Sequence, residues 1–298
     1  MKIKEKPSRI LFLLIDVIAL LLITYACLMP IWHMVMASIS NPTSLNTHPG
    51  IVYFPLKNVD FNAYKIILQY KKLWSAYGNT ILYILCTCVL TAVLTTIAGY
   101  IFSRKRFYYR NSFMIIISFT MLFNGGMIPN YIVMKSLHLT DTPLVMIIPG
   151  VLSVFNIIIM RTSMENVPTE LEEAARIDGA TDLRILWSVI LPLCKATFAV
   201  IMLFAAVAKW NDYFSALLYL PTRRDLYPLQ MALREIVIAA TADVSSSSNL
   251  LDLSESSTVY KKAIEYACIV VSTLPILCIY PFVQKYFVTG ITMGAVKS

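Results

Sequence analysis

Six long apolar runs are the feature that most constrains how this chain can fold. They lie at about residues 10–36, 79–102, 113–134, 143–160, 192–213 and 264–288. A helix of about 20 apolar residues is long enough to cross the hydrocarbon core of a bilayer, and it satisfies its own backbone hydrogen bonds there. The runs therefore predict an all-α, polytopic membrane protein with six transmembrane helices.

The composition supports this interpretation. Hydrophobic residues make up 58% of the 298 residues and charged residues only 14%, and the mean hydropathy is +0.68, which is far above the range of soluble domains. The net charge of +8 could suggest a nucleic-acid-binding protein. However, many of the Lys and Arg residues flank apolar runs instead of forming one basic face, so we expect membrane topology and not nucleic acid to explain them.

Positive charge also predicts the orientation of the chain. The basic N-terminus, residues 1–9, and the cluster "SRKRFYYR" are the densest short positive segments, and such segments face the cytoplasm. Alternation then places the tail 291–298 in the cytoplasm with the N-terminus, one at each end of a transmembrane domain that spans residues 10–290. The polar loop 161–191, inside that domain, also faces the cytoplasm. The long loops 39–78 and 214–263 fall outside the cell.

The most polar stretch of the chain, "EEAARIDGA", lies inside the cytoplasmic loop 161–191. Thr169 followed by Glu172 predicts a capping box, and Gly179 stands where a left-handed helix end belongs. Thr181 can cap a second, amphipathic helix that Pro192 interrupts. A nine-residue helix is marginal on its own in water, so we expect a partner to dock on this element; the alternative is an ordinary solvated interfacial helix.

The chain lacks the motifs of several enzyme classes. No glycine falls in a GxxxxGK[ST] pattern, and HExxH and GxSxG are absent. The sequence therefore predicts no phosphate-binding loop, no catalytic residues and no ATP hydrolysis within this polypeptide. The six Cys lie in or beside apolar runs without a CxxC pair, which favours buried thiols over a metal site.

Polar residues inside apolar runs are candidates for function, because ionisable and amide groups are unfavourable in lipid. Asp16 and Lys209 are interpreted as structural pairs or interfacial groups. Gly and Pro loosen a helix where it lines a cavity, so the segment 124–129 is the candidate translocation path. The residues assigned to that path are Asn124, Gly125, Gly126, Pro129 and Asn156.

Several motifs resemble a known family. Glu173-Ala174-Ala175, Asp178-Gly179-Ala180 and Ile190-Leu191-Pro192 match the EAA motif of importer-type ABC permeases at the family's spacing. "FNGGMIPNYIVM", "WNDYFSALLYL", "YPLQMALRE" and the C-terminal "QKYFVTGITMGAVK" extend the match over nearly the whole chain. The sequence resembles the carbohydrate, MalG-like permeases with the importer type I (MetI-like) fold, and within them the LplC/YtcP branch.

The resemblance implies a function and a set of partners. The chain would be the transmembrane permease subunit of an ATP-driven, binding-protein-dependent importer of oligosaccharides in a bacterial cell membrane. It would form the path with a second, MalF-like permease by alternating access. Two cytoplasmic ATP-binding subunits would use ATP and Mg, an extracytoplasmic solute-binding lipoprotein would deliver the saccharide, and this chain would bind no cofactor itself.

The resemblance also implies roles for particular residues. The coupling helix would seat in the ATPase subunit, the C-terminal tail would reach the ATPase dimer, and the second external loop would meet the binding protein. The coupling residues are Glu170, Glu173, Ala174, Ala175, Asp178, Gly179, Ala180 and Pro192. The tail residues are Gly294, Ala295, Val296 and Lys297, and the binding-protein residues are Tyr227, Leu229, Gln230 and Arg234.

Two other classes of protein compete with this interpretation. An ion-coupled secondary transporter is also polytopic, but it needs no docking loop for an ATPase. A membrane-embedded enzyme would need a convergent nucleophile, acid and base, which the sequence does not present. Dependence of transport on ATP or on an ion gradient separates the first rival from the importer.

Overall fold

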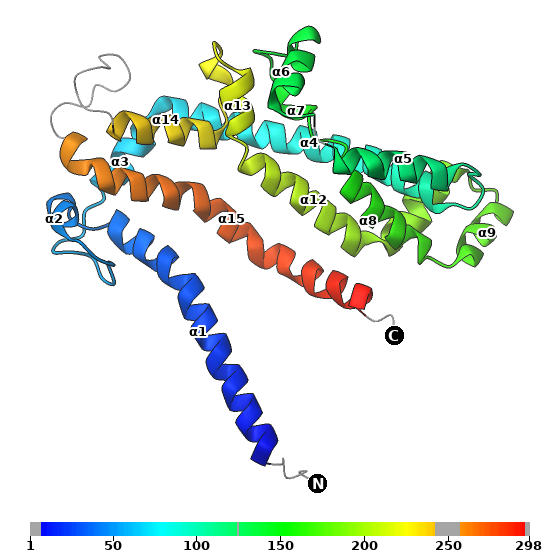
Figure 1. Ribbon diagram of the computed structural model, residues 1–298, viewed down its shortest axis with the longest axis horizontal. Helices are drawn as coiled ribbons and strands as arrows, with labels where there is room; N and C mark the ends of the chain where they lie inside the picture. Colours follow the sequence, from blue (N-terminus) through cyan, green and yellow to red (C-terminus); the bar gives the residue numbers. More distant parts are fainter. Residues whose placement is uncertain (1–6, 124, 242–256, 296–298) are drawn as a thin grey trace. The chain divides into compact units, whose positions relative to one another are not determined.

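The computed structural model describes residues 7–123, 125–241 and 257–295, and these ranges contain helices and no strand. The chain divides into two compact units. One comprises residues 1–70 and 234–274, and the other comprises residues 71–233 and 275–298. Figure 1 labels most helices of both units.

The first unit is built around the N-terminal helix and the start of the C-terminal one. Its helices are α1 (Pro7–Ser38), α2 (Pro42–Thr47), α3 (Asn62–Gln69), the later part of α14 (Leu229–Thr241) and the first part of α15 (Ser257–Ala295). The Nδ2 group of Asn46 donates to the carbonyl of Val259 at 2.9 Å. The hydroxyl of Tyr260 donates to the Asp60 carboxylate at 3.1 Å. The segment 39–78, which the sequence predicted as an external loop, therefore contains two short helices held to α15. Its last residues, from Lys71 on, already belong to the long helix α4.

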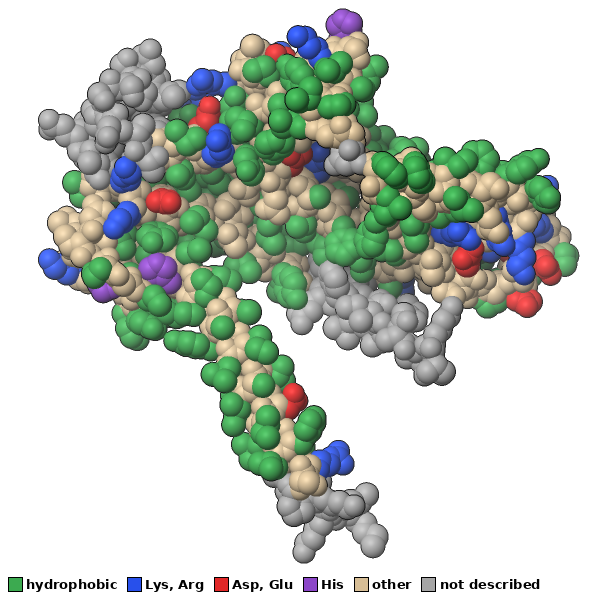
Figure 2. Space-filling view, viewed as in Figure 1, with side chains coloured by type: hydrophobic (Ala, Val, Ile, Leu, Met, Phe, Trp, Pro, Cys, Tyr) green, Lys and Arg blue, Asp and Glu red, His purple; other side chains and the backbone are tan. Residues whose placement is uncertain are grey.

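Helix α1 presents apolar side chains on all sides. The most apolar window of its segment Leu11–Ser38 has a mean hydropathy of 2.6, and none of that window is buried. Figure 2 shows the hydrophobic surface along this helix. Asp16 lies exposed on it. A helix that is apolar on all sides is found buried in a protein core or in a membrane. We therefore expect lipid or another protein to cover the surface of α1.

The second unit contains the polar loop and most of the chain. Helix α4 (Lys71–Ser103) packs against α8 and α12 along its length (Figure 1). The other helices, in chain order, are α5 (Arg110–Leu122), α6 (Met127–Ser136), α7 (Leu144–Ile147), α8 (Val154–Glu165), α9 (Thr169–Ile177), α10 (Asp182–Ile185), the π-helix η1 (Leu186–Ile190), α11 (Leu191–Leu193), α12 (Lys195–Trp210), α13 (Phe214–Tyr219), the 3₁₀ helix η2 (Arg224–Leu226) and the first residues of α14.

Helix α4 buries its small and hydroxyl-bearing residues and exposes its large apolar ones. The buried face repeats every three or four residues and includes Thr80, Thr87, Thr91, Thr95 and Gly99. Exposed side chains include Leu82, Leu85, Val89 and Val93. This distribution is the reverse of a soluble helix and is typical of membrane helices, in which small residues let helix backbones approach closely.

Three described helices are long and apolar enough to cross a membrane: Leu11–Ser38 in α1, α4 and Val259–Pro281 in α15. Two bent pairs, α5 with α6 and the α10–α11 segment with α12, would raise the number to five if each were one span. The predicted span 143–160 is not a single helix, since α7 ends at Ile147 and α8 begins at Val154. Pro149 cannot donate a backbone hydrogen bond and Gly150 has a positive φ of 85°, so the helix is interrupted there.

Candidate functional site

The polar loop forms two short helices joined by a tight turn in the second unit. Helix α9 covers Thr169–Ile177 and α10 begins at Asp182, as the sequence predicted. The expected capping box does not form, because Pro168 occupies the N-cap position and makes no side-chain hydrogen bond. Thr169 is thereby the first residue of the helix instead of its cap, and the carboxylate of Glu172 is used elsewhere.

Gly179 ends α9 in the left-handed conformation that the sequence predicted, with φ of 79°. The amide of Ala180 donates to the carbonyl of Ala175 at 2.9 Å, and the amide of Gly179 donates to that of Arg176 at 3.0 Å. These two bonds make a Schellman motif, which satisfies carbonyls that the end of a helix leaves unpaired. The Thr181 side chain then accepts from the amide of Arg184 and caps α10.

The predicted coupling residues divide between the surface of the loop and its base. Ala175 and Ala180 are half-buried against an apolar cluster under the loop that includes Met164 and Ile185. The exposed members are Glu170, Glu173, Ala174, Asp178, Gly179 and Pro192. Two large apolar side chains stand beside them in solvent, since Ile177 is 87% and Leu183 64% exposed. The tip therefore offers a mixed apolar and acidic surface.

Glu172 is the residue of this loop whose role the sequence analysis missed. Its side chain is 6% exposed and lies 3.1 Å from the Nε atom of Arg104 and 2.7 Å from a guanidinium nitrogen of Arg176. The hydroxyl of Tyr100 donates to the same carboxylate at 3.2 Å. The i,i+4 spacing of Glu172 and Arg176 is a local signal for one of these contacts. The others carry none, because Tyr100, near the end of α4, and Arg104, directly after it, reach α9 only in the folded chain.

Arg176 extends this network to α10. It donates to the Asp182 carboxylate at 3.0 Å, and that hydrogen bond raises the pKa of the Arg176 guanidinium above its ordinary value. A cleft of about 540 Å³ adjoins the network, and its lining includes Lys105, Arg106 and Glu173. Figure 2 shows acidic and basic side chains gathered at this end of the second unit.

Pro192 does not interrupt the second helix at the predicted place. It lies at the start of α11, directly after the π-helix η1. The wider turn of a π-helix accommodates a local irregularity in the bonding pattern, such as the missing amide of a proline. The break comes at Cys194, and the two helical segments on either side meet at 88°.

The predicted translocation segment coincides with a break between two helices. Helix α5 ends at Leu122 and α6 starts at Met127, with a bend of 113° and a φ of 88° at Gly126. Gly125, Gly126 and Pro129 are exposed, whereas Asn124 lies outside the described residues. Asn156 is buried in the first turn of α8 instead of facing solvent. Lys209 pairs with Asp212 at 3.2 Å.

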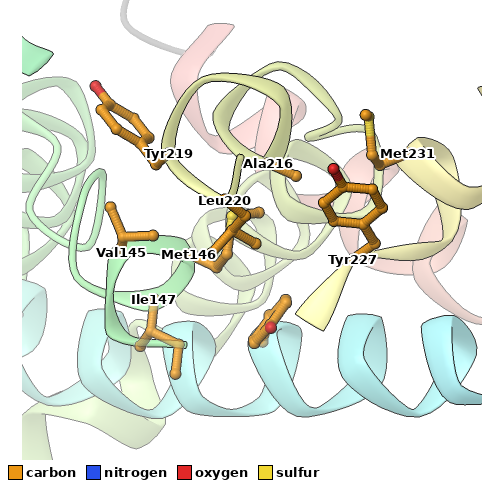
Figure 3. Packing of buried hydrophobic residues seen from close by; sticks show 9 residues of the cluster. Val145, Met146, Ile147, Ala216, Tyr219, Leu220, Tyr227 and Met231 are labelled. Atoms are coloured by element: carbon orange, nitrogen blue, oxygen red, sulfur yellow. The ribbon is translucent and has the colours of Figure 1, made fainter. Parts of the chain in front are cut away.

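An apolar cluster (Figure 3) brings together buried side chains of α4, α7, α13 and the segment 227–231, and residues of α6 pack against it. Tyr219 stacks on Tyr131 with ring centroids 6.1 Å apart. Tyr227, one of the predicted binding-protein residues, is buried in this cluster, and Leu229 is fully buried at the start of α14. Gln230, in the same unit, is half-buried, so it has more surface to offer a partner than those two.

The other predicted site residues are Arg234 and the tail residues 294–297. Arg234 belongs to the first unit and is half-buried. Gly294 and Ala295 fall in the last turn of α15, and Val296 and Lys297 lie outside the described residues. Across the parts of the chain that the structure describes, no three His, Cys, Asp or Glu side chains gather in a way that could hold a metal ion.

Comparison with known proteins gives this arrangement a context. Residues 92–241 match the family described as "Binding-protein-dependent transport system inner membrane component". The chain is 35% identical to the polygalacturonan/rhamnogalacturonan transport system permease protein YtcP of Bacillus subtilis, over 93% of this chain and 95% of that protein. It is 34% identical to the protein LplC of the same organism, over 91% of this chain and 89% of that one.

A solved structure agrees with these relatives. The crystal structure of a bacterial ABC transporter involved in the import of the acidic polysaccharide alginate contains a chain that is 33% identical to this one. The match has a TM-score of 0.84 and covers 96% of this chain and 100% of that chain. The polar loop α9–α10 lies inside the segment that the family model matches.

Proposed function

This chain belongs to the family of binding-protein-dependent transport system inner membrane components, and from that membership we propose that it is the permease subunit of an ATP-driven importer of oligosaccharides. Members of this family work with a second permease, ATPase subunits and a binding protein. In the proposed complex, this chain and a homologous permease enclose the path, and two ATPase subunits bind from the cytoplasm. ATP and Mg are used there and not by this chain.

The observation that carries the proposal is the tip of the loop α9–α10. It exposes Ile177 and Leu183 beside the carboxylates of Glu170 and Glu173. Exposed apolar groups ringed by charge are typical of a protein interface. The loop is also anchored to α4 and α8, the helices of the transmembrane bundle, so a partner that moves the tip would move those helices.

The substrate class is inferred from relatives. YtcP is named for polygalacturonan and rhamnogalacturonan, and the solved relative is involved in the import of alginate, which is an acidic polysaccharide. We therefore expect an oligosaccharide released from a polysaccharide, and uronic-acid oligosaccharides are the first compounds to test. Orientation follows from the positive-inside rule, with both termini and the loop α9–α10 in the cytoplasm of a bacterial cell.

Reconstitution tests the proposal directly. The chain is co-purified with its neighbouring permease and ATPase subunits and placed in liposomes with the loaded binding protein outside. Uptake of labelled oligosaccharide should require ATP inside the liposomes. It should disappear when the ATPase subunit carries an inactivating substitution of its phosphate-binding lysine.

The ion-coupled secondary transporter makes the opposite prediction in the same liposomes. Uptake driven by a proton or sodium gradient without ATP would contradict the importer. Uptake that needs ATP but is equally fast without the binding protein would contradict the binding-protein-dependent part of the proposal.

A further inference from the structure

The attachment of α9 to the rest of the chain depends on a charged residue. This helix is described throughout, and its one buried residue is Glu172. The neighbouring acids of the same helix, Glu170 and Glu173, are exposed. Helix α9 contributes no large apolar side chain to the core, and Ala175 packs only half-buried against the apolar cluster. We therefore expect polar contacts to fix much of its orientation.

The carboxylate of Glu172 has partners on separate elements. Arg104, directly after the end of α4, approaches it at 3.1 Å, and Tyr100 within α4 donates to it. Arg104 also lies 5.1 Å from the centre of the Tyr100 ring and donates to the carbonyl of Met164 in α8 at 3.4 Å. Arg104 therefore joins the ends of α4 and α8 to α9 through one guanidinium group.

Arg176 continues the connection on the other side of the carboxylate. It pairs with Glu172 four residues earlier in α9 and with Asp182 at the start of α10. The two short helices are thus held together across the Gly179 turn by the same guanidinium. The result is an unbroken series of charged contacts from α4 through α9 to α10.

A buried carboxylate is strongly unfavourable unless it is paired, because burial removes its hydration. Arg104 and Arg176 supply that pairing for Glu172 from two sides. The contacts from the Tyr100 hydroxyl and the Arg176 guanidinium are hydrogen bonds, which require a narrow geometry at the carboxylate, whereas Arg104 contributes an ion pair through Nε. The network therefore resists rotation of α9 relative to α4 and α8.

We propose that Glu172 is a positioning residue that locks α9 and α10 to the ends of α4 and α8, so that movement of the loop by the ATPase is passed to the transmembrane helices. This inference rests on the proposed function. It assigns to Glu172 a role different from that of Glu173, which is exposed on the same helix and open to a partner.

The test compares three variants of the reconstituted complex. Glu172→Gln removes the charge, and Arg104→Lys keeps a charge but loses the planar fork. Glu165→Gln is the matched control, because Glu165 pairs with Arg161 within α8 and with Arg110 at the start of α5, on elements other than α9. The measured quantity is the number of oligosaccharides transported per ATP hydrolysed, together with the yield of assembled complex.

We expect Glu172→Gln to lower the transport-to-ATP ratio by about fivefold or more, as loss of a typical coupling interaction would. The ratio should fall less in Arg104→Lys and should stay at the wild-type value in Glu165→Gln. Merely weaker folding would reduce the yield of complex but leave the ratio of the assembled complexes unchanged.

A wild-type ratio in assembled Glu172→Gln would overturn the inference, and so would an equal fall in Glu165→Gln. If Glu172→Gln does not assemble, the transport-to-ATP ratio of Arg104→Lys is the test. A wild-type ratio in that variant would overturn the inference. Failure of the proposed function is distinguished by the wild-type complex, which would then show no ATP-dependent uptake at all.

Discussion

Gly179 illustrates how one residue determines the shape of the candidate site. Its φ of 79° lies where residues with a Cβ atom are strained, and the Schellman bonds of Ala180 and Gly179 depend on that conformation. Steric crowding by other residues does not explain the glycine, because a Cβ atom at Gly179 would meet no atom within 4 Å. The turn that directs α10 away from α9 is therefore a backbone requirement.

Gly179→Val should reduce oligosaccharide uptake and substrate-stimulated ATPase activity without lowering the amount of protein in the membrane. A β-branched residue at positive φ costs about 1–3 kcal/mol, which opens the turn and misplaces the tip. Gly78→Val is the control, since a Cβ atom at Gly78, within α4, would also meet no atom within 4 Å and would not stand at a positive φ. Equal losses in both variants would count against the conformational explanation.

Glu173→Lys should abolish uptake and stimulated ATPase activity. Glu173 is exposed on α9, and both residues have similar helix propensity, so the fold should tolerate the change. In the proposed complex Glu173 faces a basic residue of the ATPase subunit. Lys at this position would place two positive charges in contact, and like charges repel. Membrane insertion measured by fractionation should stay normal, and wild-type transport by this variant would rule out Glu173 as a docking residue.

At the scale of elements, the apolar helices of the second unit are interrupted, and hydroxyl groups of α4 form hydrogen bonds with backbone groups where helices end or begin. The hydroxyl of Thr91 donates to the carbonyl of Val151 at 3.0 Å, between α7 and α8. The hydroxyl of Thr80 accepts from the amide of Leu229 at 2.7 Å, at the start of α14. Non-helical backbone at membrane depth needs such partners, because lipid supplies none.

Thr91→Val should destabilise the protein by about 1–3 kcal/mol, since it leaves the buried carbonyl of Val151 unpaired while keeping nearly the same volume. Thermal unfolding of the purified protein in detergent measures the effect. Thr120→Val is the control, because the Thr120 hydroxyl donates to a carbonyl of its own helix, on an exposed part of α5. A similar shift for both variants would mean that the Thr91 hydrogen bond does not stabilise the break.

Gly99→Val should separate α4 from α8. A Cβ atom at Gly99 would lie 2.8 Å from the Cγ and 3.0 Å from the Cβ of Met160, and 3.3 Å from the amide nitrogen of Arg161. Overpacking of this kind costs about 1–3 kcal/mol. Thermal unfolding should show the loss, and Met160→Ala should recover part of it in the double variant. No recovery would indicate that the backbone contact with Arg161 dominates.

The sequence predicted the existence and type of these elements better than their continuity. Apolar runs identified α1, α4 and α15, and the Gly179 turn followed from local chemistry. The break at Pro149 was missed because hydropathy does not register it, and α4 supplies a hydrogen bond there from another helix. The break at Cys194 comes two residues after Pro192, where the sequence predicted an interruption. Glu172 was assigned to a capping box because its partner Arg104 is distant in sequence.

At the scale of the whole molecule, two kinds of surface serve two kinds of neighbour. Large apolar side chains are exposed on α1, α4 and α5, as a lipid-facing or permease-facing surface requires. The charged network and the exposed tip lie together at α9 and α10. In the proposed complex a separate ATPase subunit drives transport, and we expect that subunit to engage this tip.

Cross-linking from the tip tests that claim most directly. In a transport-active variant without native cysteines, Ile177→Cys places a thiol at a side chain that is 87% exposed, and Phe54→Cys places one at a side chain that is 77% exposed in the predicted external segment. Ile177→Cys should cross-link to the ATPase subunit and lose transport until a reductant is added, whereas Phe54→Cys should not reach the ATPase. Unimpaired transport with no ATPase cross-link from Ile177→Cys, or a cross-link from Phe54→Cys, would contradict the account.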